Sequence, residues 1–431
     1  MRKFKNLFKV GTLAGLMAFL PSCERDPSEK DDSYRLPKFE RVYESLVQDK
    51  LEFPSGLSNN SATRKSELKS RKGISADADG IFIQAPLFIN HHGSRGIEPY
   101  QNPIISEYTG TLENLSTNPL AEINLSDYFS DFDSPTFYPL EDSLWRARGT
   151  TLDGLVLSDG TILASSNSSD KLFKRNPSGE IEIFLQNKDL ERITDMVQGS
   201  DGKIYAVQAP LVDYDDASKV LFPKRVVSVN KDVINTEFEL PSDIISHSWE
   251  GPFPQHYPYW WRDAPLLEKL KIVENSENGK KQFGAEFYIS DLFEGKIYKV
   301  DASNKIEILA KDLQFPSSLA VDSIGNIFYT TTPLQGKEMI WDALTYKFSL
   351  NILNPETGVS EILHEFDETL RDYSDAGIWA YVNYNKEFYR IPVGYNISNV
   401  LYESKDKLEF LITNSLRGTL KYVSLDKILE K

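Results

Sequence analysis

The chain has 431 residues, and its 48 lysines and arginines stand against 64 aspartates and glutamates, a formal net charge of −16 at pH 7. A chain this acidic is a poor binder of nucleic acid, so no nucleic-acid partner is expected. Hydrophobic residues make up 40% of the chain and aromatic residues 12%, which is enough to build a large core.

The first residues have the pattern of a secretory signal peptide. Four basic residues precede an apolar run over 10–20 that is too short to span a bilayer: Arg2, Lys3, Lys5 and Lys9. The run ends in Leu20-Pro21-Ser22-Cys23, which resembles the lipobox of bacterial lipoproteins. The resemblance implies that residues 1–22 are removed and that Cys23, the only cysteine, carries the lipid. We therefore expect a protein anchored to a membrane of the bacterial cell envelope, at the outer membrane or cell surface.

A polar tether is predicted for residues 23–72, followed by one globular domain over residues 73–431. The tether is rich in Ser, Asn, Lys and acidic residues. Within it, residues 39–53 have an apolar spacing that fits either a helix or a strand docked on the main domain.

Two interleaved series of short strand-like runs reveal a threefold internal duplication. In the first series, the run at 84–87 recurs at 208–211 and, more loosely, at 331–334. In the second, the equivalent residues Asn167, Asp291 and Asn414 are 124 and then 123 residues apart. Two series with one period predict three copies of a double unit, hence six units.

Each unit has the pattern of four antiparallel strands. Over residues 315–330 two apolar runs flank a tight polar turn, and residues 347–366 supply a second hairpin. The first turn is repeated at 77–80, 158–160, 200–202 and 404–407, whereas the unit at 283–313 is blurred at its start. The prediction is an all-β fold, a six-bladed β-propeller built as three tandem two-blade units.

The stretch Pro316–Thr330 resembles the NHL repeat and the wider group of six-bladed propellers that includes gluconolactonase-like enzymes. Some members of that group are lactonases or hydrolases that hold a divalent metal in the central channel, and others only bind partners. The triplet Glu250-Gly251-Pro252 is similar to a gluconolactonase-like motif, although it precedes the fourth unit rather than the first. The resemblance therefore implies Glu250 as the candidate ligand of a divalent cation, calcium or zinc.

Long insertions are predicted on one side of the propeller. They fall either between the second and third strands of a unit or at the crossing to the next unit, and both connections lie at the same edge in a meander. The six insertions span residues 88–103, 127–149, 212–225, 241–282, 335–346 and 367–395. Function is expected on this elaborated side.

Three crossing insertions each contain an aromatic residue followed by arginine. The pairs are Trp145-Arg146, Trp261-Arg262 and Tyr389-Arg390. In one interpretation the guanidinium groups meet an anionic ligand while the rings stack on a sugar. In the other, the rings pack the insertions onto the blades and the arginines pair with nearby carboxylates.

Further polar candidates lie near the same edge. Asn167, Asp291 and Asn414 follow equivalent strands and could bind a cation or a polar ligand, or simply form turns. Four of the five histidines lie in the insertions, but no pair has the helical spacing of a metal motif: His91, His92, His247 and His256.

The sequence favours a binding protein over an enzyme, because it carries no Gly-x-Ser-x-Gly or phosphate-loop motif and its lone cysteine is assigned to the lipid. The first hypothesis is a cell-envelope lipoprotein that binds a small ligand, glycan or protein partner on its loop-rich aromatic face. The second is a metal-dependent lactonase or hydrolase, which requires Glu250 and one or more of Asn167, Asp291 and Asn414 to converge in the channel. The third is a scaffold subunit of an envelope complex.

Overall fold

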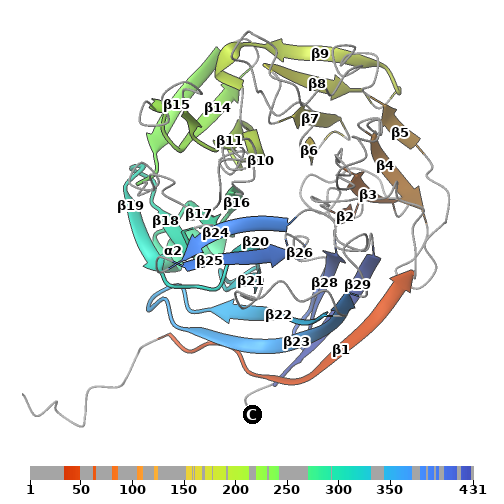
Figure 1. The fold of residues 1–431 in the computed structure, drawn as a ribbon, viewed down its shortest axis with the longest axis vertical. Helices are drawn as coiled ribbons and strands as arrows, with labels where there is room; N and C mark the ends of the chain where they lie inside the picture. The colour runs from red at the N-terminus through yellow and green to blue at the C-terminus, as the bar shows by residue number, and fades with distance from the viewer. Residues whose placement is uncertain are drawn as a thin grey trace, which may run out of the picture. The chain divides into compact units, whose positions relative to one another are not determined.

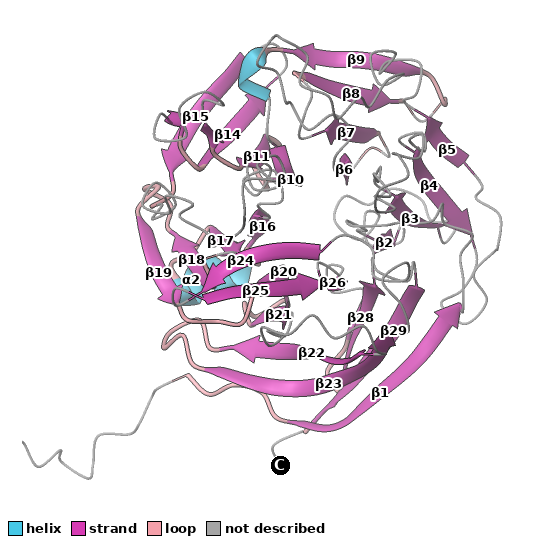
Figure 2. Ribbon diagram, viewed as in Figure 1, coloured by secondary structure: helices cyan, strands magenta, loops and turns pink. Residues whose placement is uncertain are grey.

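The structure is a computed structural model that describes residues 34–48, four short strands between 62 and 124, and most of residues 152–428. Its longest gaps after residue 152 are 213–219, 242–269, 332–343 and 371–378. In the described part, the regular elements are strands except for helix α2 (Glu277–Phe283) and a 3₁₀ turn over Lys188–Leu190 (Figures 1 and 2). The predicted all-β class is confirmed.

The strands form consecutive antiparallel sheets, each named here after its first strand. The β2 sheet contains β2 (Ala62–Arg64), β3 (Gly80–Ala85), β4 (Ile104–Thr109) and β5 (Ala121–Asn124). The β6 sheet contains β6 (Leu152–Val156), β7 (Ile162–Ser166), β8 (Lys171–Arg175) and β9 (Ile181–Gln186). The β10 sheet contains β10 (Ile193–Gln198), β11 (Ile204–Gln208), β14 (Arg225–Asn230) and β15 (Val233–Glu239).

The remaining sheets continue the same order. The β16 sheet contains β16 (Leu270–Glu274), β17 (Phe287–Asp291), β18 (Lys296–Val300) and β19 (Ile306–Ala310). The β20 sheet contains β20 (Pro316–Val321), β21 (Ile327–Thr331), β22 (Leu344–Leu353) and β23 (Ser360–Leu370). The β26 sheet contains β26 (Tyr395–Ile397), β27 (Tyr402–Glu403), β28 (Lys407–Asn414), β29 (Thr419–Lys427) and β1 (Phe39–Gln48). The meander predicted over residues 315–366 is confirmed by β20 to β23.

Successive sheets touch through their first strands: β10 contacts β6 and β16, and β20 contacts β16 and β26. Four-stranded meanders that follow one another in this way are the blades of a β-propeller. The number of six blades stays a prediction.

Apolar residues fill the spaces between neighbouring sheets. Val207 and Val226 of the β10 sheet pack with Ile272 and Ile289 of the β16 sheet, and a similar cluster joins the β20 and β26 sheets around Phe328 and Phe410. Full burial of one such side chain contributes about 1.5–3 kcal/mol, compared with about 1 kcal/mol for a typical hydrogen bond. Packing of apolar side chains therefore dominates the adhesion between sheets.

The strands of each sheet are connected at two opposite ends, which are called here the insertion edge and the turn edge. At the insertion edge the second strand passes to the third and the fourth strand leaves the sheet. At the turn edge the first and third strands turn back, as in the turn at 200–202, where the Lys203 amide donates to Asp201 Oδ1 (3.0 Å) and Gly202 has φ +83°. The turn predicted at 200–202 is confirmed.

Several of the predicted insertions contain regular structure. The insertion 241–282 was too long, because β16 occupies 270–274 and α2 begins at residue 277, so the fourth unit begins before residue 283. Helix α2 lies between β16 and β17, where the repeat pattern is blurred, with Ser276 Oγ accepting from the Gly279 amide and Gly284 ending the helix at φ +64°. The insertion 367–395 includes the end of β23 and a ribbon of β24 (Trp379–Tyr384) and β25 (Glu387–Pro392). A smaller ribbon, β12 (Leu211–Val212) with β13 (Val220–Phe222), occupies the 212–225 insertion.

Strand β1 lies inside the predicted tether, so the strand alternative for residues 39–53 is confirmed over 39–48. It pairs antiparallel with β29, with Phe39 opposite Lys427. The Ile428 amide donates to the Lys38 carbonyl (2.8 Å), and the Phe39 ring lies 6.4 Å from that of Phe328. The domain boundary at residues 72 and 73 stays a prediction.

Candidate functional site

The predicted site residues divide into those the structure describes and those it does not. Two of the three repeat-equivalent positions lie at the same place in the fold: Asp291 ends β17 and Asn414 ends β28. β17 lies next to the first strand β16, and β28 lies next to the first strand β26, so both positions fall at an insertion edge. Tyr389 and Arg390 are neighbours on β25, where they pair with Val382 and Tyr381. The remaining candidates lie outside the described residues: Cys23, Trp145, Arg146, Asn167, Glu250, Trp261, Arg262 and the four histidines of the insertions.

Asp291 belongs to a buried charged cluster between the β10 and β16 sheets. Lys224, the residue before β14, places its Nζ 2.5 Å from Asp291 Oδ2 and 2.6 Å from Glu294 Oε1. The Lys224 and Asp291 side chains are completely buried, and that of Glu294 is 7% exposed. The Glu294 amide also donates to Asp291 Oδ1 (3.0 Å). These three residues, together with Lys296 and Tyr298, are called the Lys224 cluster.

Two further residues complete the Lys224 cluster. Lys296 Nζ lies 2.7 Å from Glu294 Oε2, and the Tyr298 hydroxyl lies 3.1 Å from the same oxygen. Two ammonium groups thus balance two carboxylates, so the cluster is neutral as a whole. Neutrality matters because each unpaired buried ion would cost several kcal/mol.

The environment shifts the pKa values of the acidic groups in opposite directions. Burial raises the pKa of Asp291, because the low-polarity surroundings disfavour its charge more than Lys224 favours it. Burial also opposes ionisation of Glu294, but there the charges of Lys224 and Lys296 prevail and lower the pKa to about 2. Burial and the neighbouring carboxylates raise the pKa of Tyr298, so its hydroxyl remains a donor at neutral pH.

The Lys224 cluster sits at the base of two insertions. Lys224 ends the 212–225 insertion, and its carbonyl accepts from the Leu240 amide (2.8 Å). The next residue, Pro241, begins the other insertion, and its carbonyl lies 3.2 Å from the Tyr298 hydroxyl. That insertion returns at Leu270, which is paired with Asp291 in the sheet. Both ends of the segment 242–269 are therefore fixed beside the cluster.

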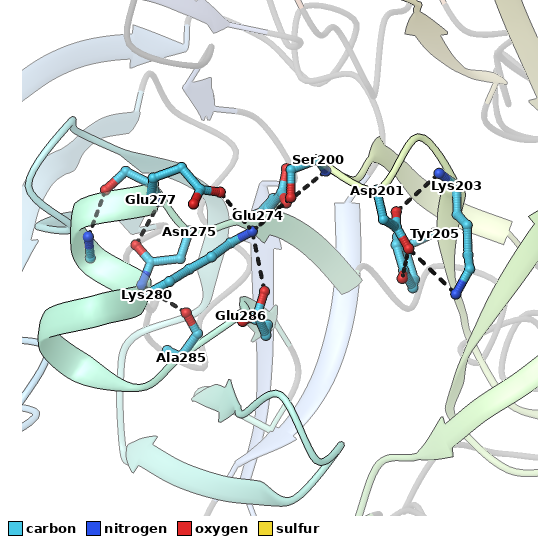
Figure 3. A network of polar contacts seen from close by, with 12 residues as sticks. Ser200, Asp201, Lys203, Tyr205, Glu274, Asn275, Glu277, Lys280, Ala285 and Glu286 are labelled. Carbon is cyan, nitrogen blue, oxygen red and sulfur yellow. Dashed lines mark hydrogen bonds and ion pairs between the residues drawn. The ribbon is translucent and has the colours of Figure 1, made fainter.

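A second lysine network lies at the turn edge of the same two sheets (Figure 3). Lys280 of α2 places its Nζ 2.6 Å from Glu274, 3.1 Å from Glu286 and 3.0 Å from Ser200 Oγ. The Ser200 amide also donates to Glu274 (2.8 Å), so this network ties the first turn of the β10 sheet to α2. The Lys280 side chain is 11% exposed.

Sequence reasoning missed Lys224 and Glu294 as partners of Asp291. A lysine just before a strand is typical of a solvated strand end, and its partners are 67 and 70 residues away. Glu294 and Asp291 both lie in the repeated run at 290–297. Their shared place in this run was the one feature of the sequence that could have linked the two carboxylates.

Neither a clustered set of metal ligands nor a membrane-spanning helix is found in the part of the chain that the structure describes. It contains no group of three or more His, Cys, Asp or Glu side chains arranged to hold a metal ion. The helices of that part include none with the length and apolar character to cross a membrane.

No family model and no curated protein matches the chain. Among solved structures, a catalytically inactive virginiamycin B lyase from Staphylococcus aureus with quinupristin is similar over 90% of this chain and 99% of its own, at 10% identity and a TM-score of 0.40. A putative gluconolactonase is similar over 90% and 94%, at 11% identity and a TM-score of 0.41. A DUF4221 family member from Bacteroides vulgatus is similar over 92% and 98%, at 11% identity and a TM-score of 0.40. At these scores the similarities do not bear on the activity of this chain.

Proposed function

We propose that the chain is a cell-envelope lipoprotein, anchored through Cys23, whose propeller binds a small ligand, glycan or protein partner at its insertion edges. The observation that carries the proposal is the placement of tryptophan. All six tryptophans fall within the predicted insertions, at positions 145, 249, 260, 261, 341 and 379. Tryptophan is strongly enriched where proteins bind partners, and its ring suits stacking on sugars.

Chemistry at the base of the insertions supports binding rather than catalysis. Each carboxylate of the Lys224 cluster is paired with an ammonium group, and the Lys224 and Asp291 side chains are completely buried. A general base or nucleophile must reach its substrate, which these groups do not. The cluster instead provides a rigid base, the arrangement that positions binding loops.

The alternative function is a metal-dependent lactonase or hydrolase with Glu250 as a metal ligand. One observation favours it: Glu250 belongs to the segment 242–269, whose flanking residues are both held at the Lys224 cluster, Pro241 by Tyr298 and Leu270 by its pairing with Asp291. In this alternative, residues of the segment would meet a divalent cation near the propeller channel.

One set of measurements tests both functions on residues 24–431, which keep β1. Because every tryptophan lies in an insertion, quenching of tryptophan fluorescence reports binding there. We expect saturable quenching by an acidic oligosaccharide from a panel that also contains neutral ones. The double substitution Trp261→Ala/Arg262→Gln should weaken that binding by about tenfold or more. Lys281→Ala, at an exposed position on α2 at the turn edge, is the control and should bind like the wild type.

The outcomes separate the two functions. Stoichiometric calcium or zinc in the wild type that is lost in Glu250→Gln would favour the hydrolase. No quenching by any saccharide, together with a failure to capture an envelope protein through the same residues, would rule out the binding proposal.

A further inference from the structure

Lys224 differs from the other cations of the described residues in its burial. Among those whose exposure is known, it is the only lysine or arginine that is buried. Burying an ammonium group is costly even when it is paired, and apolar replacements of buried ion pairs are often as stable. Net stability therefore does not explain the buried Lys224 ammonium group. The best attested role of a buried ion pair is to fix one particular arrangement of the segments that it joins.

The segments joined at Lys224 come from two sheets. Its backbone ends the 212–225 insertion and holds Leu240, and its side chain crosses to Asp291 and Glu294 of the β16 sheet. The Tyr298 hydroxyl lies 3.1 Å from Glu294 Oε2 and 3.2 Å from the Pro241 carbonyl oxygen, so its one proton is shared between these two acceptors.

The turn that contains Glu294 is hydrogen-bonded to the segment between β19 and β20. The Leu313 amide donates to the Gly295 carbonyl (2.9 Å), and a Cβ added at Gly295 would lie 2.5 Å from the Leu313 carbonyl oxygen. Gly295 has φ +61°, which favours glycine, so this turn has little freedom to shift. The network thus runs without a break from the end of one insertion to the start of another.

We propose that Lys224 is a positioning residue that sets the geometry of the two insertions rooted at 212–225 and 241–269. It would act through Asp291, Glu294 and Tyr298 on the backbone at Leu240 and Pro241. The proposal deepens the proposed function, because it identifies what orients part of the binding surface. Its test requires no ligand.

The test compares two neutral replacements in the full chain purified in detergent. Lys224→Met/Asp291→Asn removes one charge of each sign and leaves the Glu294 and Lys296 pair intact. Lys280→Met/Glu274→Gln makes the matched change at the turn edge, where no insertion is rooted. Limited trypsin digestion, followed by mass spectrometry, reports cleavage after Lys219 and Arg262, which lie within the two insertions.

We expect the Lys224 double variant to be cleaved at both sites about tenfold faster than the wild type, with its melting temperature lowered by only a few degrees. Its tryptophan emission maximum should also shift. The Lys280 double variant should be cleaved at wild-type rates, within about twofold. The single variant Lys224→Met leaves unbalanced carboxylates and should lose thermal stability more than the double variant.

Wild-type cleavage rates in the Lys224 double variant would overturn the proposal, as would equal acceleration in both double variants. If the Lys224 double variant did not fold, Tyr298→Phe would decide. That change removes only the hydroxyl that lies between Glu294 and Pro241, and unchanged cleavage after Arg262 would then overturn the proposal. A wild type that binds no ligand would disprove the proposed function and leave these measurements valid.

Discussion

At the scale of single residues, repeated turn aspartates occupy different environments. Asp322 is buried and accepts from the Asn326 amide (2.8 Å) and Asn326 Nδ2 (2.6 Å). Burial, and to a smaller extent the charge of Glu403, raise the pKa of Asp322 to about 6, although the hydrogen bonds from Asn326 and, more weakly, the charge of Lys427 oppose the shift. Asp301, in the third-to-fourth strand turn of the β16 sheet, makes similar amide bonds but is only partly buried, and hydrogen bonds lower its pKa.

Asp322 should therefore make the fold less stable as pH rises. Its folded-state pKa lies above the ordinary value of 3.8, so the folded state binds the proton more tightly than the unfolded state. The resulting stability is fully present below pH 3.8 and is lost as pH rises through 6. The loss is on the order of 2–3 kcal/mol. Urea unfolding of the wild type and Asp322→Asn at pH 4.5 and 7.5 checks this prediction.

The variant should lack this component of the pH dependence, whereas Asp301→Asn should keep it. Identical pH profiles for the wild type and Asp322→Asn would show that the Asp322 carboxyl does not titrate in this range.

At the scale of elements, α2 joins three sheets. Through Lys280 it contacts the β10 sheet, and Asn278 Nδ2 donates to the Ser323 carbonyl of the β20 sheet (3.1 Å). Gly279 of the helix lies against Gly325, where an added Cβ would come within 2.6 Å of the Gly279 Cα. The sequence contains the helix signals, Ser276 before the helix and Gly284 after it, but the insertion predicted over 241–282 covers most of the helix, and no helix was predicted there.

A pair of glycine substitutions measures how tightly α2 packs. Gly325 and Gly202 both have positive φ in first-hairpin turns, but only Gly325 has close neighbours, since a Cβ at Gly202 would meet no atom within 4 Å. Gly202→Ala should cost about 1 kcal/mol through backbone strain alone. Gly325→Ala should cost about 2–4 kcal/mol, because a steric clash with α2 adds to the strain. Equal losses in urea unfolding would contradict this packing.

At the scale of the whole molecule, local pattern predicted the sheets but not their long-range partners. The antiparallel hairpins of residues 315–366 depend on nearby residues, so alternation and turn residues revealed them. The pairing of β1 with β29 and of Lys224 with Asp291 joins distant segments, for which neither strand pattern nor charge gives a local signal.

Removing β1 should expose the edge of β29 and weaken the β26 sheet. A chain that begins at residue 49 is expected to melt roughly 5 °C or more below the full chain, because the pairing and the Phe39 contact are lost. A chain that begins at residue 34 keeps β1 and should melt with the full chain. Calorimetry of both truncated chains distinguishes a strand that stabilises the sheet from one that merely lies on it.

The same pairing has a consequence for biosynthesis. Phe39 and Lys427 are 388 positions apart, so the ribosome has made nearly all of the chain before the two strands can meet. Contacts of such long range form slowly, because a large loop must close first. A chain predicted to cross a membrane before it folds gains from this delay, since the β26 sheet stays incomplete throughout export and closes only once the last strand has arrived.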